Sequence, residues 1–318
     1  MSLLFIVDPL EALKAYKDSS VAMMREAARR GHDVWASPQP SLRWRDGKVT
    51  ATAQLLAING DANADDHAWY ALRETGEHEL STFDAVLMRK DPPFDSEYLY
   101  STHLLEAAER GGARVFNSAR ALRDHNEKLA ITEFAQFAVP TVVSREPDVL
   151  RAFQAEFGDV VLKPLDGMGG ASVFRVKTGD PNLNVILETI TQLGSRTVMA
   201  QRFIPEIRDG DKRVLLIAGQ PVPYALARIP KPGESRGNLA AGGTGRAQPL
   251  SEGDRAIAAA LGPTLAARGL LLVGLDVIGN HLTEVNVTSP TCFVEIGQQT
   301  GFNVAGMFID ALEAALAR

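Results

Sequence analysis

The sequence of 318 residues has little cysteine, no excess of positive charge and no long apolar run. Its one cysteine, Cys292, has no second thiol with which to form an internal disulfide, so nothing indicates an oxidising compartment. The formal net charge of −6 argues against a surface that binds nucleic acid or an anionic membrane, because such a surface needs clustered positive charge. The apolar segment Met1–Val7 is too short to span a membrane, and no basic segment precedes it as in a signal peptide. We therefore expect a cytoplasmic protein without nucleic-acid or membrane partners.

The residues that are present indicate a globular protein built around a sheet. The chain has 45% hydrophobic and 23% charged residues, and its length suits two or three domains. In the first third, the apolar segments Leu3–Val7 and Asp84–Met88 alternate with helical segments such as Ser96–Arg110. This alternation predicts an α/β fold with a parallel sheet covered by helices. Ligands bind beyond the carboxyl ends of strands in such sheets, where residues 8–19 and 89–95 form polar clusters.

The pattern changes near Asp124. We predict a helix over Glu127–Phe137, and short strands at Val160–Lys163 and Ser172–Val176 on either side of a glycine-rich turn. Ile229–Pro249 has no periodicity and is rich in Gly and Pro, so a functional or disordered loop is expected there. The expected domains are 1–123, 124–201 and 202–318.

The segment Gly274–Val287 predicts a β-hairpin with acidic side chains. Glu284 and Asn286 are two residues apart and project from one face of their strand. A three-residue loop, Gly279–His281, would place Asp276 opposite Glu284, whereas a two-residue loop would turn it away. These oxygen ligands suit Mg²⁺, and the absence of His and Cys from this face argues against zinc. The alternative is an ordinary polar face of an antiparallel sheet.

A second motif resembles a phosphate-binding loop. Lys163 ends an apolar strand, and Gly167, Gly169, Gly170 and Ser172 follow it as Gly-x-Gly-Gly-x-Ser. Glycines let backbone N–H groups approach a phosphate, and the lysine adds a positive charge. The loop is neither a Walker A motif nor a dinucleotide fingerprint, because the required Lys-Ser/Thr and final glycine spacings are missing. The alternative is a tight hairpin.

Several cations lie between the two motifs: Lys128, Arg213, Arg228, Arg236 and Arg246. Arginine forks bind carboxylates and phosphates through two hydrogen bonds, so these residues suit a polyanionic substrate together with ATP. The alternative is that they are solvated surface charges, which we accept for Arg246. We reject it for Arg213 and Arg228, since each follows or precedes an apolar strand end.

A polar turn follows the hairpin. The segment Asn286–Thr291 could present backbone N–H groups to a substrate carboxylate or a developing oxyanion, or it could be a simple turn before the last helices. Cys292 has no histidine near it in sequence, so we interpret it as a buried structural thiol.

Four strings together resemble one family. Residues 163–170, 89–95, 236–243 and 286–291 are similar to segments of bacterial (prokaryotic) glutathione synthetases, which are ATP-grasp enzymes. The resemblance covers nearly the whole chain, except that Arg43–Gly76 carries no matching motif. It implies an N-terminal parallel-sheet (pre-ATP-grasp) domain, followed by an α+β ATP-grasp fold with a small lid subdomain. It also implies a homo-oligomer.

The resemblance implies that ATP drives the ligation of γ-glutamylcysteine to glycine through an acyl phosphate, which gives glutathione, ADP and phosphate. Mg²⁺ or Mn²⁺ would be held by Asp276, Glu284 and Asn286. Residues 229–244 would form a lid over the intermediate. The implied ATP contacts are Lys128, Lys163, Gly167, Gly169, Gly170, Ser172, Gln201, Phe203, Ile204 and Asp211. The implied catalytic residues are Arg213, Arg228, Arg236, Asn286 and Ser289. The implied substrate contacts are Asp18, Ser19, Ser20, Arg89, Asp91 and Thr291.

Three other functions remain open on the sequence. One is a different ATP-grasp carboxylate–amine ligase. Another is a small-molecule kinase, because the absence of His-Arg-Asp and Asp-Phe-Gly strings excludes only kinases that resemble protein kinases. The third is a nucleotide-sensing protein that has lost its activity.

Overall fold

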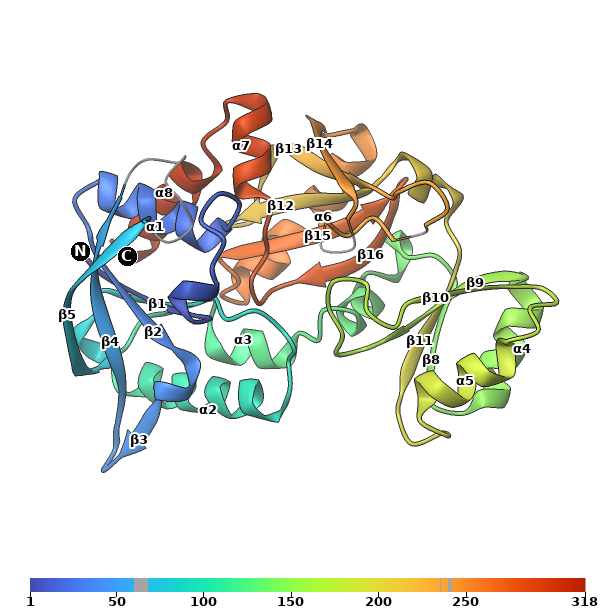
Figure 1. Cartoon of the computed structure of the whole chain (residues 1–318), viewed down its shortest axis with the longest axis horizontal. Coiled ribbons are helices and arrows are strands. Elements are labelled where there is room, and N and C mark those ends of the chain that lie inside the picture. Colours follow the sequence, from blue (N-terminus) through green and yellow to red (C-terminus); the bar gives the residue numbers. More distant parts are fainter. Residues whose placement is uncertain (60–67, 235, 240–241, 318) are drawn as a thin grey trace.

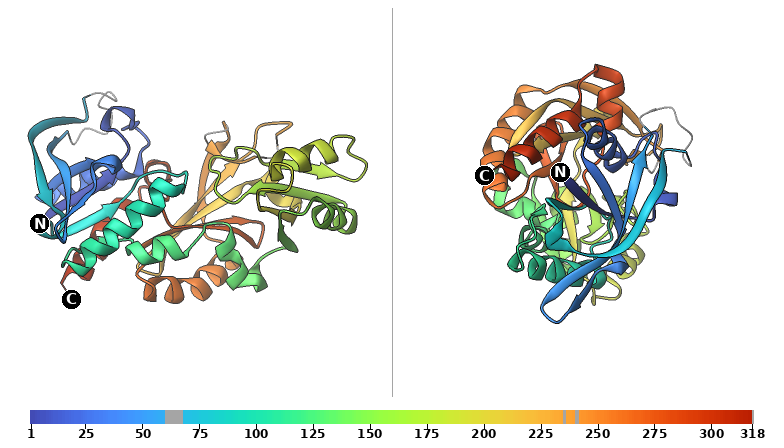
Figure 2. Two further views of the ribbon diagram at one scale, coloured as in Figure 1. Left: turned by 90° about the horizontal axis from the view of Figure 1, so that it is seen from below. Right: turned by 90° about the vertical axis from the view of Figure 1, so that its left-hand side faces the viewer.

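The computed structural model describes the chain except residues 60–67, 235, 240–241 and 318. Part of the unmatched stretch Arg43–Gly76 and part of the predicted lid therefore lie outside the described residues. The molecule is elongated and contains three sheets (Figures 1 and 2). The N-terminal sheet lies at one end, strands β8 to β11 at the other, and strands β12 to β16 between them.

The N-terminal sheet has the strand order β3-β4-β2-β1-β6-β7, with β5 paired to β4. Its strands are β1 (Ser2–Val7), β2 (Asp33–Pro38), β3 (Arg43–Arg45), β4 (Lys48–Ile58), β5 (Tyr70–Glu79), β6 (Ala85–Met88) and β7 (Val115–Phe116). The prediction of a parallel sheet is confirmed for β2, β1, β6 and β7. The stretch without a motif instead adds antiparallel strands, β3 to β5. The turn at Asp46-Gly47 reverses the chain between β3 and β4.

Strand β1 is apolar throughout because both faces of the sheet are covered. Leu3 and Phe5 belong to a core shared with helices α1 and α8, whereas Leu4 and Ile6 belong to a core shared with α2 and α3. Asp18 caps α1, since its Oδ1 accepts hydrogen bonds from the two backbone amides Ser20 N and Val21 N. These helices are α1 (Ser19–Arg29), α2 (Ser96–Arg110), α3 (Ala119–Asp124) and α8 (Val304–Leu316).

The second sheet is antiparallel, with the order β10-β9-β11-β8, and has its own small core against α4 and α5. Its elements are β8 (Thr141–Ser144), α4 (Pro147–Phe157), β9 (Asp159–Pro164), β10 (Phe174–Lys177), α5 (Leu183–Thr191) and β11 (Val198–Arg202). The predicted helix before it is wrong in type: η4 (Leu129–Phe137) is a 3₁₀ helix. Phe134 leaves the helical region at φ −123° and ψ 39°, which interrupts a regular α-helical hydrogen-bond ladder.

The third sheet is antiparallel, with the order β14-β13-β12-β15-β16. Its elements are β12 (Asp211–Ile217), β13 (Gln220–Ile229), β14 (Thr244–Pro249), α6 (Glu252–Ala267), β15 (Leu272–Ile278), β16 (His281–Asn286) and α7 (Phe293–Thr300). The expectation of a loop over the whole of Ile229–Pro249 is therefore wrong at its end, where β14 pairs with β13. The short 3₁₀ helices are η1 (Leu10–Ala12), η2 (Gln39–Ser41), η3 (Leu80–Thr82) and η5 (Pro205–Asp209).

The three sheets follow one another along the chain. The first sheet ends at Phe116, and the second begins at Thr141. The expected boundary between 201 and 202 falls one residue before the end of β11. No helix in the described part of the chain is both long and apolar enough to cross a membrane.

Candidate active site

The acidic hairpin β15–β16 has an unexpected register. Ile278 pairs with His281, so the turn contains two residues, Gly279 and Asn280. Such a turn was expected to point Asp276 away from Glu284, but the register shifts after Asp276, and Thr283 is the extra residue of a β-bulge. Asp276 is therefore directly opposite Glu284. The prediction that Asp276 and Glu284 share a face is confirmed. The expectation that this requires a three-residue loop is wrong, because the turn has two residues and the bulge restores the pairing.

Asp276 lies between two arginines from the neighbouring strands. Arg213 of β12 donates from Nε to Asp276 Oδ1 over 2.6 Å and from Nη2 to Oδ2 over 3.3 Å. Arg228 of β13 places Nη2 2.9 Å from Oδ2. Burial acts to raise the pKa of Asp276, but the charges of the two arginines outweigh burial and hold the pKa below its ordinary value. The carboxylate is therefore ionised at neutral pH.

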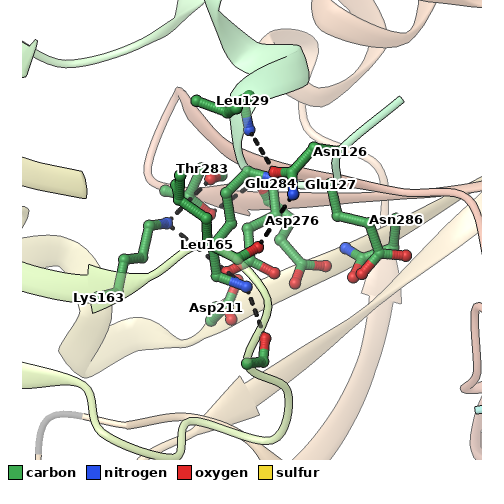
Figure 3. A network of polar contacts seen from close by, with 12 residues as sticks. Asn126, Glu127, Leu129, Lys163, Leu165, Asp211, Asp276, Thr283, Glu284 and Asn286 are labelled. Carbon is green, nitrogen blue, oxygen red and sulfur yellow. Dashed lines mark hydrogen bonds and ion pairs between the residues drawn. The ribbon is translucent and has the colours of Figure 1, made fainter. Parts of the chain in front are cut away.

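Two lysines from outside the hairpin converge on Glu284, and one of them, Lys163, is labelled with Glu284 in Figure 3. The Nζ atoms of Lys128 and Lys163 each lie 3.6 Å from Glu284 Oε1. Lys163 Nζ also donates to the carbonyl of Thr283 over 3.1 Å, and Lys128 Nζ donates to the carbonyl of Gly167 over 2.7 Å. Burial lowers the pKa of Lys163, and the charge of Glu284 opposes this shift. The two motifs found in the sequence therefore meet at Glu284.

The glycine-rich turn packs against the described part of the predicted lid. Gly170 has φ +79°, and a Cβ atom there would lie 2.7 Å from Asn238 Oδ1. Arg236 donates from Nη1 to the carbonyl of Gly170 over 3.3 Å and forms an ion pair with Glu234. Arg236 therefore joins the lid to the turn.

A cavity of about 120 Å³ lies under the turn and contains most of the predicted ATP contacts. Gln201 donates its side chain to Thr141, so a ligand beside β11 would meet its backbone. Ser172 is exposed, with φ +56°, and does not line this cavity. The predicted contacts that do line it are Lys128, Lys163, Gly167, Gly169, Gly170, Gln201, Phe203, Ile204 and Asp211.

A larger cavity, of about 560 Å³, adjoins the first and extends toward the N-terminal sheet. Gly167, Asp276 and Glu284 line both cavities. The predicted residues that line the larger cavity also include Asp18, Asp91, Arg213, Arg228, Asn286, Ser289 and Thr291. The two cavities therefore share their lining at the acidic hairpin and the glycine-rich turn.

Three predicted substrate contacts lie behind the wall of this cavity instead. Arg89 is buried, and it donates to Ser20 Oγ over 3.1 Å and to the carbonyl of Pro290 over 2.9 Å. Ser19 Oγ accepts the N–H of Phe293 over 3.2 Å. These residues attach the N-terminal domain to the turn at 289–293, because their polar groups are used in protein contacts.

Two acidic residues at the cavity wall were not predicted. Glu127 accepts hydrogen bonds from residues at the end of β16, about 160 positions later. Glu295 has a buried Oε2 atom without a hydrogen-bond partner among the described residues, and burial raises the pKa of its carboxyl group. No sequence motif marks either residue, because the surroundings of both side chains are set by the tertiary fold. Cys292, also at this wall, is buried as predicted.

The hairpin fits a divalent cation in its donor chemistry. Asn286 donates Nδ2 to the carbonyl of Gly274 over 3.2 Å, which leaves Oδ1 as an acceptor beside the two carboxylates. Hard oxygen donors of this kind suit Mg²⁺. Within the described ranges, no three His, Cys, Asp or Glu residues form a metal-binding group, so the fit depends on the Asn286 amide and on oxygens of a bound phosphate.

Known proteins resemble this chain over its whole length. Residues 1–123 match the family model described as the N-terminal domain of prokaryotic glutathione synthetase, and residues 127–301 match its ATP-grasp domain. The chain is 62% identical over 318 residues to the glutathione synthetase of Nitrosomonas europaea, covering 100% of this chain and 99% of that protein. It is 63% identical over 315 residues to the glutathione synthetase of Ralstonia nicotianae, covering 99% and 96%. The crystal structure of D-cycloserine synthetase DcsG has a TM-score of 0.69 and 17% identity, covers 99% of this chain and 100% of its own, and supports the fold alone.

Proposed function

Because the chain belongs to the prokaryotic glutathione synthetase family, it functions in glutathione synthesis as an ATP-dependent ligase, and we propose how its residues perform the reaction. The substrates proposed are γ-glutamylcysteine and glycine, with ATP and Mg²⁺ or Mn²⁺. The cysteinyl carboxylate would take the γ-phosphoryl group, and the amine of glycine would then displace phosphate from the acyl phosphate.

ATP would occupy the smaller cavity. Lys128 and Lys163 lie where the phosphates would meet the acidic hairpin, and the Gly167–Gly170 turn would cover them with backbone N–H groups. Asp276, Glu284 and Asn286 would hold the divalent cation, which neutralises developing charge on the phosphoryl oxygens when bound. Ser172 is exposed and does not line the smaller cavity, so the structure does not support its assignment as an ATP contact.

The dipeptide would occupy the larger cavity. Arg213 and Arg228 line it and would bind the carboxylate and the acyl phosphate, with Ser289 and Thr291 at the oxyanion. Glu295 has an unpaired, buried carboxylate oxygen there, which suits the ammonium group of the γ-glutamyl residue. Arg89, Ser19 and Ser20 would act indirectly, because they hold the turn that carries Ser289.

An acyl phosphate hydrolyses readily, so the site must exclude water during the second step. Arg236 and Asn238 of the lid already contact the glycine-rich turn at Gly170. We therefore assign the described residues of 229–244 to a cover over the reacting groups.

One observation carries this proposal: Asp276 opposes Glu284, and Lys128 and Lys163 meet Glu284 at the junction of the two cavities. The test is to incubate the protein with γ-glutamylcysteine, glycine, ATP and Mg²⁺ and to measure ADP and glutathione. Turnover only with another acid and amine would indicate a different ligase. A stable phosphorylated product without any amine would indicate a kinase, and ATP binding without ADP release would indicate a sensor.

Two further proposals come from the resemblance alone. We propose that the protein works in the cytoplasm and that it forms a homo-oligomer. Analytical ultracentrifugation of the full chain would determine the oligomeric state.

A further inference from the structure

Glu127 accepts hydrogen bonds that a neighbouring strand would otherwise accept from the outer edge of β16. Among the described strands, β16 is the outermost of its sheet, and alternate N–H groups of such a strand point away from the sheet. The N–H of Val285 donates to the backbone carbonyl of Glu127 over 2.8 Å. The N–H of Val287 donates to the carboxylate oxygen Oε1 of the same residue over 3.0 Å. Glu127 thus accepts both outward N–H groups on either side of Asn286.

The same carboxylate oxygen also holds the residue after Val287. Thr288 donates to Glu127 Oε1 from its backbone N over 3.2 Å and from its hydroxyl over 2.8 Å. Asn117 donates to the carbonyl of Val287 over 2.8 Å from the N-terminal domain. The outer edge at the end of β16 is therefore held by Glu127, through its backbone carbonyl and its carboxylate, and by Asn117, whereas the inner edge pairs with β15.

Glu127 also connects this strand end to the nucleotide side of the site. The next residue, Lys128, lies 3.6 Å from Glu284 and donates to the carbonyl of Gly167. A shift of Glu127 would therefore move both Asn286 and Lys128, and Figure 3 shows Glu127 beside Glu284, Asp276 and Asn286.

We propose that Glu127 is a positioning residue, which sets the place of Asn286 for divalent-cation binding by fixing the backbone on both sides of it. This inference rests on the proposed assignment of the metal to Asp276, Glu284 and Asn286. The magnesium ion requires near-ideal geometry, so a small displacement of one ligand weakens binding. Loss of a residue that orients a metal ligand typically costs 10- to 100-fold in metal affinity or activity.

The acceptor oxygen, rather than the charge, carries the proposed role. Glu127→Gln keeps an amide oxygen whose two lone pairs can accept two of the three donors, whereas Glu127→Ala removes the side-chain acceptor altogether. Glu109→Ala is the matched control, because Glu109 also accepts a backbone N–H from a distant segment, that of Ala119 over 3.2 Å, but does not line either cavity.

Three measurements on the full chain test the proposal. Hydrogen exchange followed by mass spectrometry reports the protection of amides 285–288. Calorimetric titration with Mn²⁺–ADP reports metal-nucleotide affinity, and the Mg²⁺ concentration for half-maximal glutathione formation reports function. Glu127→Ala should lose protection at amides 287 and 288, whose acceptor is the removed carboxylate. It should also bind Mn²⁺–ADP about 10-fold more weakly and need about 10-fold more Mg²⁺. Glu127→Gln should stay close to the unmodified protein in all three, and Glu109→Ala should change only the melting temperature.

Asn286→Ala, measured with these variants, tests the metal assignment separately from the positioning role of Glu127. If Asn286→Ala leaves the Mn²⁺–ADP affinity and the Mg²⁺ requirement unchanged, the metal assignment is wrong, and the proposed role of Glu127 is then wrong as well. If Asn286→Ala weakens both but Glu127→Ala weakens neither, the assignment stands and the positioning role is wrong. A Glu127→Gln variant as defective as Glu127→Ala would also overturn the proposal, since charge would then matter instead of the acceptor.

Discussion

At the scale of single residues, the site is an alternation of opposite charges. Asp276 is shared by Arg213 and Arg228, and Arg228 also bonds Asp211 over 2.6 Å. Burial raises the pKa of Asp211 to about 6, against the opposing charge of Arg228. Each of these four charges has an opposite charge beside it, as the cost of desolvating charges requires. A substrate carboxylate or phosphate would enter a site whose arginines are already oriented.

Arg213 is the arginine on which the proposed chemistry depends most. We expect Arg213→Ala to lower kcat by about 10²- to 10³-fold, the size typical of losing one transition-state donor. Arg246→Ala is the control, because Arg246 is exposed and lines neither cavity. Steady-state rates of ADP release measure both variants, and near-normal activity of Arg213→Ala would show that the assignment is wrong.

Glu26 offers a pH-dependent test remote from the site. Its bonds to Arg29 lower the pKa of its carboxyl group from 4.5 to about 2, with burial opposing and Arg30 assisting. A lowered folded-state pKa means that the stabilisation is present above about pH 4.5 and is lost as the pH falls toward 2. Because Arg29 is largely exposed, we expect about 1–2 kcal/mol after screening by solvent.

The measurement is the difference in free energy of unfolding between the unmodified protein and Glu26→Gln, from urea denaturation at several pH values. The difference should be constant from pH 8 to pH 6 and should shrink by pH 3.5. A difference that stays the same at pH 3.5 would contradict the lowered pKa.

At the scale of elements, the contact between the glycine-rich turn and the lid decides how water is excluded. Gly170 and Gly179 both have positive φ, +79° and +77°, so alanine at either position strains the backbone by a similar amount, about 1 kcal/mol. Of these two positions, Gly170 is the one at which the added Cβ would meet another segment, at Asn238, whereas no described atom lies within 4 Å at Gly179.

We therefore expect Gly170→Ala, but not Gly179→Ala, to raise the amount of ADP formed per glutathione, because the displaced lid would admit water to the acyl phosphate. Parallel assays of ADP and glutathione give this ratio. Equal ratios for the two variants would count against water exclusion by the lid.

At the scale of the whole molecule, Asn117 joins the N-terminal domain to the third sheet. It donates Nδ2 to the carbonyls of Leu272 and Val287, each over 2.8 Å, and accepts the N–H of Leu272 at Oδ1 over 2.9 Å. Its side chain is buried, so the groups left by its removal would lack both partner and water.

Asn117→Ala should lower the free energy of unfolding by about 2–4 kcal/mol, the cost of leaving such groups unpaired. Calorimetric melting would show it as a clear drop in melting temperature, and Asn182→Ala, at an exposed asparagine, should leave the temperature nearly unchanged. If both variants melt alike, the link through Asn117 adds little to the stability of the molecule.

Local patterns in the chain were enough to predict most elements and the residue types of the site. The apolar run at β1 and the spacing of Glu284 and Asn286 are local features, and the structure contains both. The four family strings also sufficed for the ATP-grasp assignment, because they are long and specific.

Only the folded chain decided which of these residues meet. The bulge at Thr283 reversed the register expected of a two-residue turn, the kink at Phe134 changed the type of a helix, and Arg89 proved to be buried behind the cavity wall. The role of Glu127 was likewise hidden, since its partners lie about 160 residues away. Hydrophobic periodicity and capping act over a few neighbouring residues, whereas hydrogen-bond pairing across sheets depends on how distant segments pack.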